Sequence, residues 1–265
     1  MVQVKASDVQ ALRKATGAGM LDVKKALEEA DGDSERAAQI LREKGIVSAA
    51  KRSDRDSSEG AVALSMIGER VGAMVELKCE TDFVAKSQEF VNTANEIATA
   101  VAEGGTGAAD EFKAMLESLQ LTLKENISAG KVVRIEAGEG ELVSGYLHVQ
   151  ADRGVNGVLV HVADVGSELA HEIALHIAFS KPGYLSKEDV PAAVVEAERQ
   201  TLETLTRNEG KPEAAIPKII EGRLNGFFRS VCLLEQPFVK DEKQRVREVL
   251  GSGRILSFAQ VVIGD

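Results

Sequence analysis

Histidine and cysteine are the first residue types to test for chemistry in this sequence. His171 and His176 lie in HEIALH, which resembles a zinc-binding helix. A spacing of five, however, places the two imidazoles about 140° apart around a helix, so one metal ion cannot easily bind both. Each histidine is expected to be hydrogen-bonded within the fold or to face a partner. Cys79 and Cys232 lack CxxC spacing and stand among apolar neighbours, which predicts buried thiols and no metal site.

The sequence supports a phosphate-binding site or a catalytic nucleophile as little as it supports a metal site. TGAGM at 16–20 could present amides to a phosphate, but a tight turn is the favoured interpretation. SAGKVV, around Lys131, lacks the upstream glycine and the hydroxyl residue of a phosphate-binding loop, and no GxSxG motif is present. We therefore expect no cofactor and no enzymatic activity. A hydrolase that uses both histidines and a carboxylate is the weakest alternative.

The remaining candidate is an aromatic ring in CETDFVAKSQEF, residues 79–90. Asp82 and Phe83 are predicted to lie in the first turn of a helix that directly follows a strand, with Thr81 or Asp82 as its cap. Phe83 precedes Phe90 by seven residues and so lies within about 20° of the core stripe of that helix, which favours burial. An exposed ring at the tip of the helix is the alternative.

Composition limits the class of protein. The chain has 265 residues, of which 44% are hydrophobic and 28% charged, so it can form one or two folded domains. A net charge of −10 argues against a generic nucleic-acid binder. No apolar run is long enough to span a membrane, and MVQVKASD lacks the apolar region of a secretory signal. A cytoplasmic protein that binds neither nucleic acid directly nor membranes is expected.

Three short helices are predicted between Ser7 and Gly45. Ser7 should cap the first, TGAGM should separate it from the second, and Asp33 should cap the third, which Gly45 would end. KRSDRDSSEG at 51–60 is charged and rich in serine, and is predicted to be a linker. Residues 1–55 carry eleven basic and nine acidic side chains, net +2, which leaves −12 for the remainder. They are therefore expected to form a separate three-helix domain with the start of a linker.

A pattern of a β-hairpin followed by a helix occurs twice in the rest of the chain. The strands AVALSMI and VGAMVEL precede a long helix, and a second helix is predicted from about Asp110 to Ser128. The strands VVRIEA, ELVSGYLHV and GVLVHVADV follow, the last two separated by a turn at 152–157, and Ser167 should cap the helix ELAHEIALHIAF. The repeat predicts two related subdomains, at 56–140 and 141–265.

The two copies differ between strand and helix. Matching Gly72 with Gly157 gives an offset of 85, and matching Glu96 with Glu172 gives 76, so the first copy has nine additional residues, which include TDFVAKSQ. If these residues are helical, they lengthen the first helix by about 13 Å and place Phe83 on a protruding tip. Burial and exposure of Phe83 therefore both stay open.

Residues 187–228 are predicted to form a helical hairpin joined at Gly210-Lys211-Pro212, with its second helix starting as late as Ile216. A strand-like VCLLEQPFV, a charged helix near 241–250 and a terminal strand RILSFAQVVI complete the chain. The predicted fold class is α+β: a three-helix bundle, a duplicated core of two antiparallel-sheet subdomains with helices, and a projecting helical hairpin. This anatomy favours a protein that grips a partner at several points.

Two long segments resemble the signatures of the bacterial translation elongation factor Ts family: LRKATGAGMLDVKKALEEADGD at 12–33 and ELKCETDFVAKSQEF at 76–90. HIAFSKPGYL at 176–185 and EGRLNGFF at 221–228 are similar to the family as well. The resemblance implies that the N-terminal bundle is like a ubiquitin-associated domain. It also implies that the protein is a non-enzymatic guanine-nucleotide exchange factor in translation elongation, which promotes GDP release from elongation factor Tu and allows GTP to rebind.

The resemblance also implies which residues touch elongation factor Tu, in its GDP-bound and nucleotide-free forms. Asp82 and Phe83 would insert beside the magnesium site of its nucleotide domain. His176 and its neighbours would face its third domain, and the hairpin forms homodimers in some relatives. The remaining contacts to the nucleotide domain would come from Thr81 and Val84 and, in the N-terminal bundle, from Arg13, Met20, Leu21 and Lys24. An adaptor that binds a ubiquitin-like or nascent-chain partner through residues 1–55 is the alternative.

Overall fold

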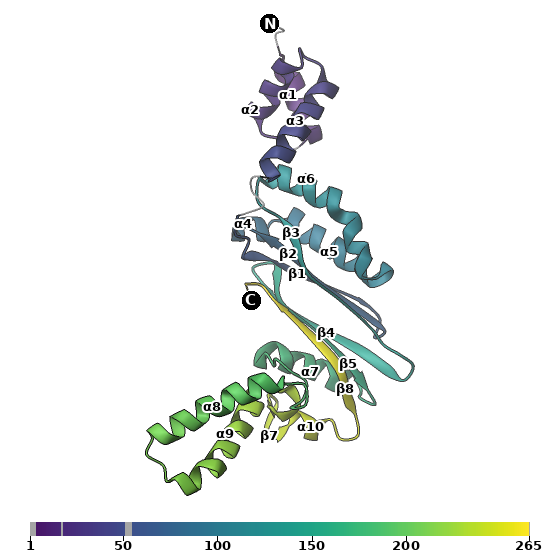
Figure 1. Cartoon of the computed structure of the whole chain (residues 1–265). Helices are drawn as coiled ribbons and strands as arrows, with labels where there is room; N and C mark the ends of the chain where they lie inside the picture. The colour runs from purple at the N-terminus through teal and green to yellow at the C-terminus, as the bar shows by residue number, and fades with distance from the viewer. Residues whose placement is uncertain (1–3, 17, 51–54, 265) are drawn as a thin grey trace.

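The computed structural model describes residues 4–16, 18–50 and 55–264. Figure 1 shows an elongated molecule, with a helical bundle at one end, two sheets in the middle and a helical hairpin at the other end. The α+β fold class predicted from the sequence is confirmed. None of the described helices combines the length and the apolar character needed to cross a bilayer.

The N-terminal bundle packs around a small core formed by Leu12, Val23, Leu27 and their neighbours. The Asp33 carboxylate accepts hydrogen bonds from the amides of Glu35 and Arg36 at 2.9 and 3.1 Å, which confirms it as the cap of the third helix. The three helices are α1 (Ala6–Thr16), α2 (Met20–Glu29) and α3 (Ser34–Ala50).

Two boundary predictions in this region are wrong. The first helix already starts at Ala6, so Ser7 lies inside it and is not its cap. Gly45 does not end α3, because the helix runs to Ala50, and the helical cost of one glycine is only about 1 kcal/mol. Residues 51–54 of the predicted linker lie outside the described residues, and its last two, Glu59 and Gly60, already belong to the first strand.

The first hairpin and a third strand form an antiparallel sheet in the order β1-β2-β3. The helices of the first copy cover one face of this sheet (Figure 1). The predicted second helix is shorter than expected: Lys124 has a positive φ of 61° and ends it, and Ser128 begins a strand that pairs with β2. The elements are β1 (Glu59–Ile67), β2 (Val71–Cys79), α4 (Asp82–Ala85), α5 (Gln88–Gly104), the 3-10 helix η1 (Thr106–Phe112), α6 (Lys113–Leu123) and β3 (Ser128–Glu136).

The second hairpin and helix repeat this plan in a sheet of order β4-β5-β8. The helical hairpin and a two-stranded ribbon are inserted between α7 and β8. The elements are β4 (Glu141–Gln150), β5 (Arg153–Ala163), α7 (Ser167–Ser180), α8 (Ala192–Asn208), the 3-10 helix η2 (Glu213–Ala215), α9 (Ile216–Val231), the 3-10 helix η3 (Leu233–Glu235), β6 (Pro237–Phe238), β7 (Asp241–Arg245), α10 (Val246–Val249) and β8 (Arg254–Val262).

Several local predictions for this half are corrected. The hairpin turn is only Ala151-Asp152, both with positive φ, so β5 starts earlier than expected. Ser167 does not cap α7, because Gly166 takes that position without a side-chain bond. VCLLEQPFV is not one strand: α9 runs to Val231, Cys232 makes an isolated bridge with Tyr184, and Pro237–Phe238 forms a strand. The predicted helix near 241–250 begins as the strand Asp241–Arg245. The predicted start of α9 at Ile216 is confirmed.

The two sheets pack against each other through a shared core that includes Val62, Met74, Val143, Leu159 and Val261. The two glycines that anchor the sequence repeat lie in this contact. A Cβ on Gly72 would come within 2.4 Å of the Leu159 side chain, and one on Gly157 within 2.8 Å of the Val62 side chain. Each glycine therefore makes room for a side chain of the other sheet, and this holds the two copies together.

Candidate partner-binding site

The helical interpretation expected the segment between β2 and α5 to lengthen α5, but it does not. It forms the separate one-turn helix α4, because Ser87 has an extended backbone and caps a new helix through the amide of Phe90 at 3.4 Å. Phe83 therefore does not share the core stripe of α5. Its side chain is 83% exposed, whereas Phe90 is fully buried. Of the two alternatives left open by the sequence, the exposed ring is the one found.

The start of α4 is attached to the segment after α6. The Glu125 carboxylate accepts hydrogen bonds from the amides of Glu80 and Thr81 at 2.9 and 3.0 Å, and also from the Thr81 hydroxyl. In the reverse direction, the Glu80 carboxylate accepts from the amide of Asn126 at 2.7 Å and pairs with Arg55 at 3.3 Å. Hydrogen bonds to an ionised carboxylate are the strong kind, so this junction holds the backbone before α4 in place.

The helix α4 is also held by its own cap and at its far end. Thr81, one of the two caps that the sequence allows, accepts from the amide of Val84 at 3.4 Å. The Ser87 hydroxyl donates to the Val84 carbonyl at 2.8 Å. Ala85 is fully buried in the core of the first sheet, and Val84 packs partly against the same core. An exposed aromatic ring thus stands on a turn that is fastened on both sides.

Asp82 lies beside this ring and is engaged within the chain. Its carboxylate pairs with the Lys86 ammonium, one helical turn further on, at 2.5 Å. This hydrogen bond is the main reason that the pKa of Asp82 is lowered from its usual 3.8. At neutral pH α4 therefore presents a negative charge, a positive charge and a ring within one turn.

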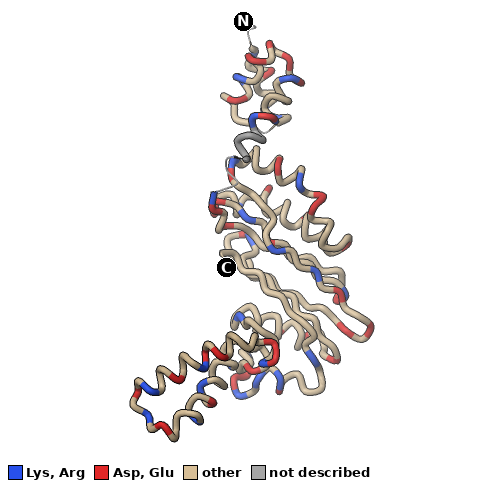
Figure 2. Tube along the Cα trace, viewed as in Figure 1, with Lys and Arg blue, Asp and Glu red and all other residues tan. Residues whose placement is uncertain are grey.

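The N-terminal bundle presents a second apolar surface. Met20 and Leu21, at the start of α2, are 62% and 64% exposed, and Arg13 and Lys24 are exposed as well. Asp22 in the same turn pairs with Lys124 at 3.2 Å, and Lys124 directly precedes the Glu125 that holds α4. The expected contact residues of the bundle and those of α4 are thus attached to one short segment. Acidic and basic residues are mixed over the bundle (Figure 2).

His176 does not belong to an exposed surface. Its side chain is 1% exposed, donates from Nε2 to Gln236 at 2.9 Å and accepts at Nδ1 from the amide of Val239 at 3.2 Å. Burial lowers the pKa of this imidazole from its usual 6.5, so the neutral ring is favoured. The imidazole is thus hydrogen-bonded within the fold, and the expected partner contact through His176 and its neighbours stays a prediction.

Unlike His176, two other residues of α7 present exposed apolar side chains. Phe179 is 78% exposed, and Leu175, one turn before it, is also exposed. Ile173 and Ile177 of the same helix are fully buried. The signal for this exposed face was present in the sequence, since residues 175 and 179 lie on the side of a helix opposite to the buried isoleucines.

The described residues offer little for catalysis. Burial raises the pKa of Cys79 to about 12 and also raises that of Cys232, so both thiols stay protonated. Among the described residues, no group of three or more His, Cys, Asp or Glu is arranged to hold a metal ion. His171 is exposed beside the Tyr146 ring, at 6.3 Å, and so does not share a site with the buried His176.

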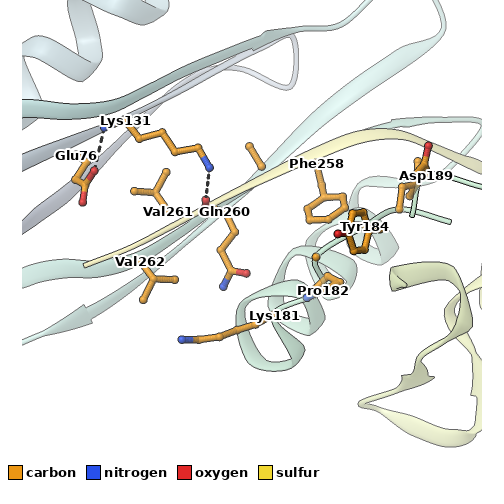
Figure 3. A pocket seen from close by; sticks show the side chains of 13 residues that line it. Glu76, Lys131, Lys181, Pro182, Tyr184, Asp189, Phe258, Gln260, Val261 and Val262 are labelled. Carbon is orange, nitrogen blue, oxygen red and sulfur yellow. Dashed lines mark hydrogen bonds between the residues drawn. The ribbon is translucent and has the colours of Figure 1, made fainter. Parts of the chain in front are cut away.

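A groove of about 740 Å³ lies between the two sheets and the segment after α7 (Figure 3). Its central polar groups already bond within the chain. The Lys131 ammonium donates to the Gln260 carbonyl at 2.9 Å, and the Lys131 amide donates to the Glu76 carboxylate at 2.9 Å. The lysine covers the open edge of β8, a usual protection of an edge strand. We therefore take α4, and not this groove, as the main candidate site.

Comparison with known proteins supports the resemblance. The family model described as Elongation factor TS matches residues 80–265. The chain is 43% identical to Elongation factor Ts of Renibacterium salmoninarum, 44% to that of Clavibacter michiganensis subsp. michiganensis and 43% to that of Micrococcus luteus. Each of these matches covers 100% of both proteins.

Proposed function

Because the chain belongs to the elongation factor Ts family, we propose that it is a guanine-nucleotide exchange factor for elongation factor Tu. In this role it promotes release of GDP, leaves a nucleotide-free complex and allows GTP to bind, in the cytoplasm where elongation takes place. The observation that carries the proposal is Phe83, an exposed ring on a turn that is fastened on both sides.

The proposed mechanism is a wedge that makes and breaks no covalent bond. Phe83 would insert beside the magnesium site of the nucleotide domain of Tu, with Asp82 next to it and Thr81 and Val84 supporting the contact. A wedge lowers nucleotide affinity only if it selects a conformation of Tu that holds nucleotide and magnesium poorly. Linkage then requires that nucleotide weakens binding of this chain by the same factor.

The rigidity of α4 supports this role. A side chain that is ordered before binding loses less conformational freedom on association than one on a flexible loop. Aromatic side chains are also frequent anchors of protein interfaces. A large apolar side chain that is 83% exposed contributes little to the fold and is available as an anchor for a partner.

Further contacts would hold Tu while the nucleotide leaves. We propose that Met20 and Leu21, flanked by Arg13 and Lys24, touch the nucleotide domain from the bundle of residues 1–55. On the second subdomain we assign the contact with the third domain of Tu to the exposed neighbours of His176, chiefly Phe179. Several linked contacts raise the overall affinity without requiring any one of them to be strong.

The helical hairpin is not needed for this mechanism. Its helices pack against each other through Ile216, Ile220 and Leu224, with Val195 and Leu202 opposite. Both helices carry acidic and basic residues (Figure 2). Self-association through this hairpin stays a prediction, which the mass of the protein in solution would test.

The proposal is tested by stopped-flow release of a fluorescent GDP analogue from elongation factor Tu. We expect the wild-type chain to accelerate GDP release. With Phe83→Ala the acceleration should be at least about tenfold smaller, as for the loss of a typical interface anchor. Val149→Ala, at another exposed apolar position, is the matched control and should behave like wild type. No acceleration by the wild type would overturn the function. Equal acceleration by Phe83→Ala would keep the function and reject the wedge.

A further inference from the structure

The segment Lys124 to Asn126 is placed where three parts of the chain meet. It follows α6 and precedes β3, far in sequence from α4 and from the N-terminal bundle. Ile127, directly after it, is fully buried in the core of the first sheet, and the Ile127 carbonyl accepts from the Gln120 side chain at 2.6 Å. The segment is therefore anchored in the core on its C-terminal side.

Each residue of this segment holds a different neighbour. Lys124 pairs with Asp22 of the bundle at 3.2 Å, and the Asn126 side chain donates to the carbonyl of Arg55 at 2.9 Å, where the chain arrives from the linker. The Asn126 amide also donates to the Glu80 carboxylate at 2.7 Å, whereas Glu125 holds the backbone before α4 with its side chain. It is half-buried, and its carboxylate accepts from two consecutive backbone amides and one hydroxyl, at Glu80 and Thr81.

We propose that Glu125 is a positioning residue for nucleotide exchange, which holds the backbone before α4 so that Phe83 meets elongation factor Tu in its working position. This inference rests on the proposed function, and it assigns to Glu125 the task of positioning the Phe83 ring. The amides that Glu125 binds immediately precede α4, so their direction sets the direction of the ring. The bonds come from a rigid part of the core and not from α4 itself.

The size of the effect follows from the bonds that are lost. Removal of the carboxylate leaves two amides and a hydroxyl without their acceptor, and hydrogen bonds to charged groups are among the stronger ones in proteins. A displacement of a reacting or inserting group by about 1 Å is enough to lower a rate strongly. We expect Glu125→Ala to lower the maximal rate of GDP release by about tenfold. Glu125→Gln, which keeps one acceptor oxygen, should fall between Ala and wild type.

The test combines kinetics with hydrogen exchange on the full-length chain. GDP release from Tu is measured against the concentration of wild type, Glu125→Ala, Glu125→Gln and Phe83→Ala, which separates the maximal rate from the half-saturating concentration. Amide exchange by mass spectrometry reports protection at residues 80 and 81. The matched control is Glu141→Ala, because the Glu141 carboxylate also accepts from a loop amide, that of Gly138 at 2.7 Å, but in the second subdomain.

We expect both Glu125 variants to lose protection at residues 80 and 81 and to lose maximal rate, while Glu141→Ala does neither. In a Phe83→Ala background, Glu125→Ala should have no further effect on the maximal rate, because both changes act through the same ring.

A folded Glu125→Ala with the wild-type rate would overturn the inference and leave the proposed function intact. An undiminished effect of Glu125→Ala without Phe83 would also overturn it. If Glu125→Ala does not fold, Glu125→Gln decides by the same readouts. Failure of the wild type to release GDP would reject the function itself.

Discussion

The two copies of the hairpin-and-helix unit differ most in the connection from strand to helix. After β2 the chain uses residues 80–87 to reach α5, and this stretch forms α4 with its exposed ring. After β5 it reaches α7 through residues 164–166. The second copy carries its insertion after the helix instead, as the pair α8 and α9. The same core thus supports different surface devices at different connections, which fits a fold that is retained while its surfaces specialise.

The largest effect should separate the two phenylalanines of the first copy. Phe90→Ala removes a fully buried ring from α5 and should lower the free energy of unfolding by about 3–5 kcal/mol. Phe83→Ala should change it by less than about 0.5 kcal/mol, because the ring is exposed. Urea unfolding followed by circular dichroism measures both. Similar losses for the two variants would mean that α4 belongs to the core and that the first copy has no separate surface device.

The second copy has a buried side chain at the point where a contact was expected. His176→Ala should lower the free energy of unfolding by about 2–4 kcal/mol, because it opens a cavity and leaves Gln236 and the Val239 amide without a partner. Phe179→Ala, from the exposed face of the same helix, is the control and should cost less than about 0.5 kcal/mol. If His176→Ala were as stable as wild type but defective in exchange, the imidazole would be a contact after all.

The same histidine gives the second copy a dependence on pH. Its pKa in the folded chain is lowered below the usual 6.5, so under mildly acidic conditions the unfolded chain binds more protons than the folded one. The stabilisation is therefore complete above about pH 6.5 and is lost as the pH falls, by about 1.4 kcal/mol for each unit of pKa shift. His176→Gln should lack this slope between pH 7.5 and 5.5. Parallel curves for variant and wild type would contradict a neutral, buried imidazole.

The sequence predicted the order of elements well because periodicity and turn residues are local. The hairpin of AVALSMI and VGAMVEL, the helix over Phe90 and the start of α9 at Ile216 were all found as expected. Its errors lie where tertiary contacts decide. Ser128 looked like the end of a helix because its pairing with β2 is not visible locally. VCLLEQPFV has the composition of a strand, but only Pro237–Phe238 forms one.

The candidate site shows the same limit. The first-turn position of Asp82 and Phe83 and the cap at Thr81 could be predicted from residue types alone. The exposure of Phe83 could not, because it depends on the break at Ser87, and a serine inside a helical pattern is compatible with either outcome. Glu125 was missed because its partners lie 44 and 45 residues away in the sequence, and the periodicity of one helix carries no record of them.

The smallest effect concerns how the bundle is attached to the first copy. Asp22 and Lys124 form an ion pair at 3.2 Å, but both side chains are more than half exposed. Water and salt screen such a pair, so Asp22→Asn should lower the free energy of unfolding by less than about 0.5 kcal/mol. Glu28→Gln, at the exposed pair with Lys24 within α2, is the matched control and should cost as little.

The attachments of the bundle and of α4 differ in kind: the Asp22–Lys124 pair is exposed, whereas Glu125 accepts from two amides and a hydroxyl. If Asp22→Asn is nearly neutral, the bundle is held to the first copy loosely and can adjust to Tu, while α4 stays in place. In that case Asp22→Asn should leave the maximal rate of GDP release unchanged and change only the concentration needed for half of it, whereas Glu125→Ala lowers the rate itself. A loss of more than about 1 kcal/mol in Asp22→Asn, well above the usual value for an exposed pair, would show instead that bundle and α4 move as one body.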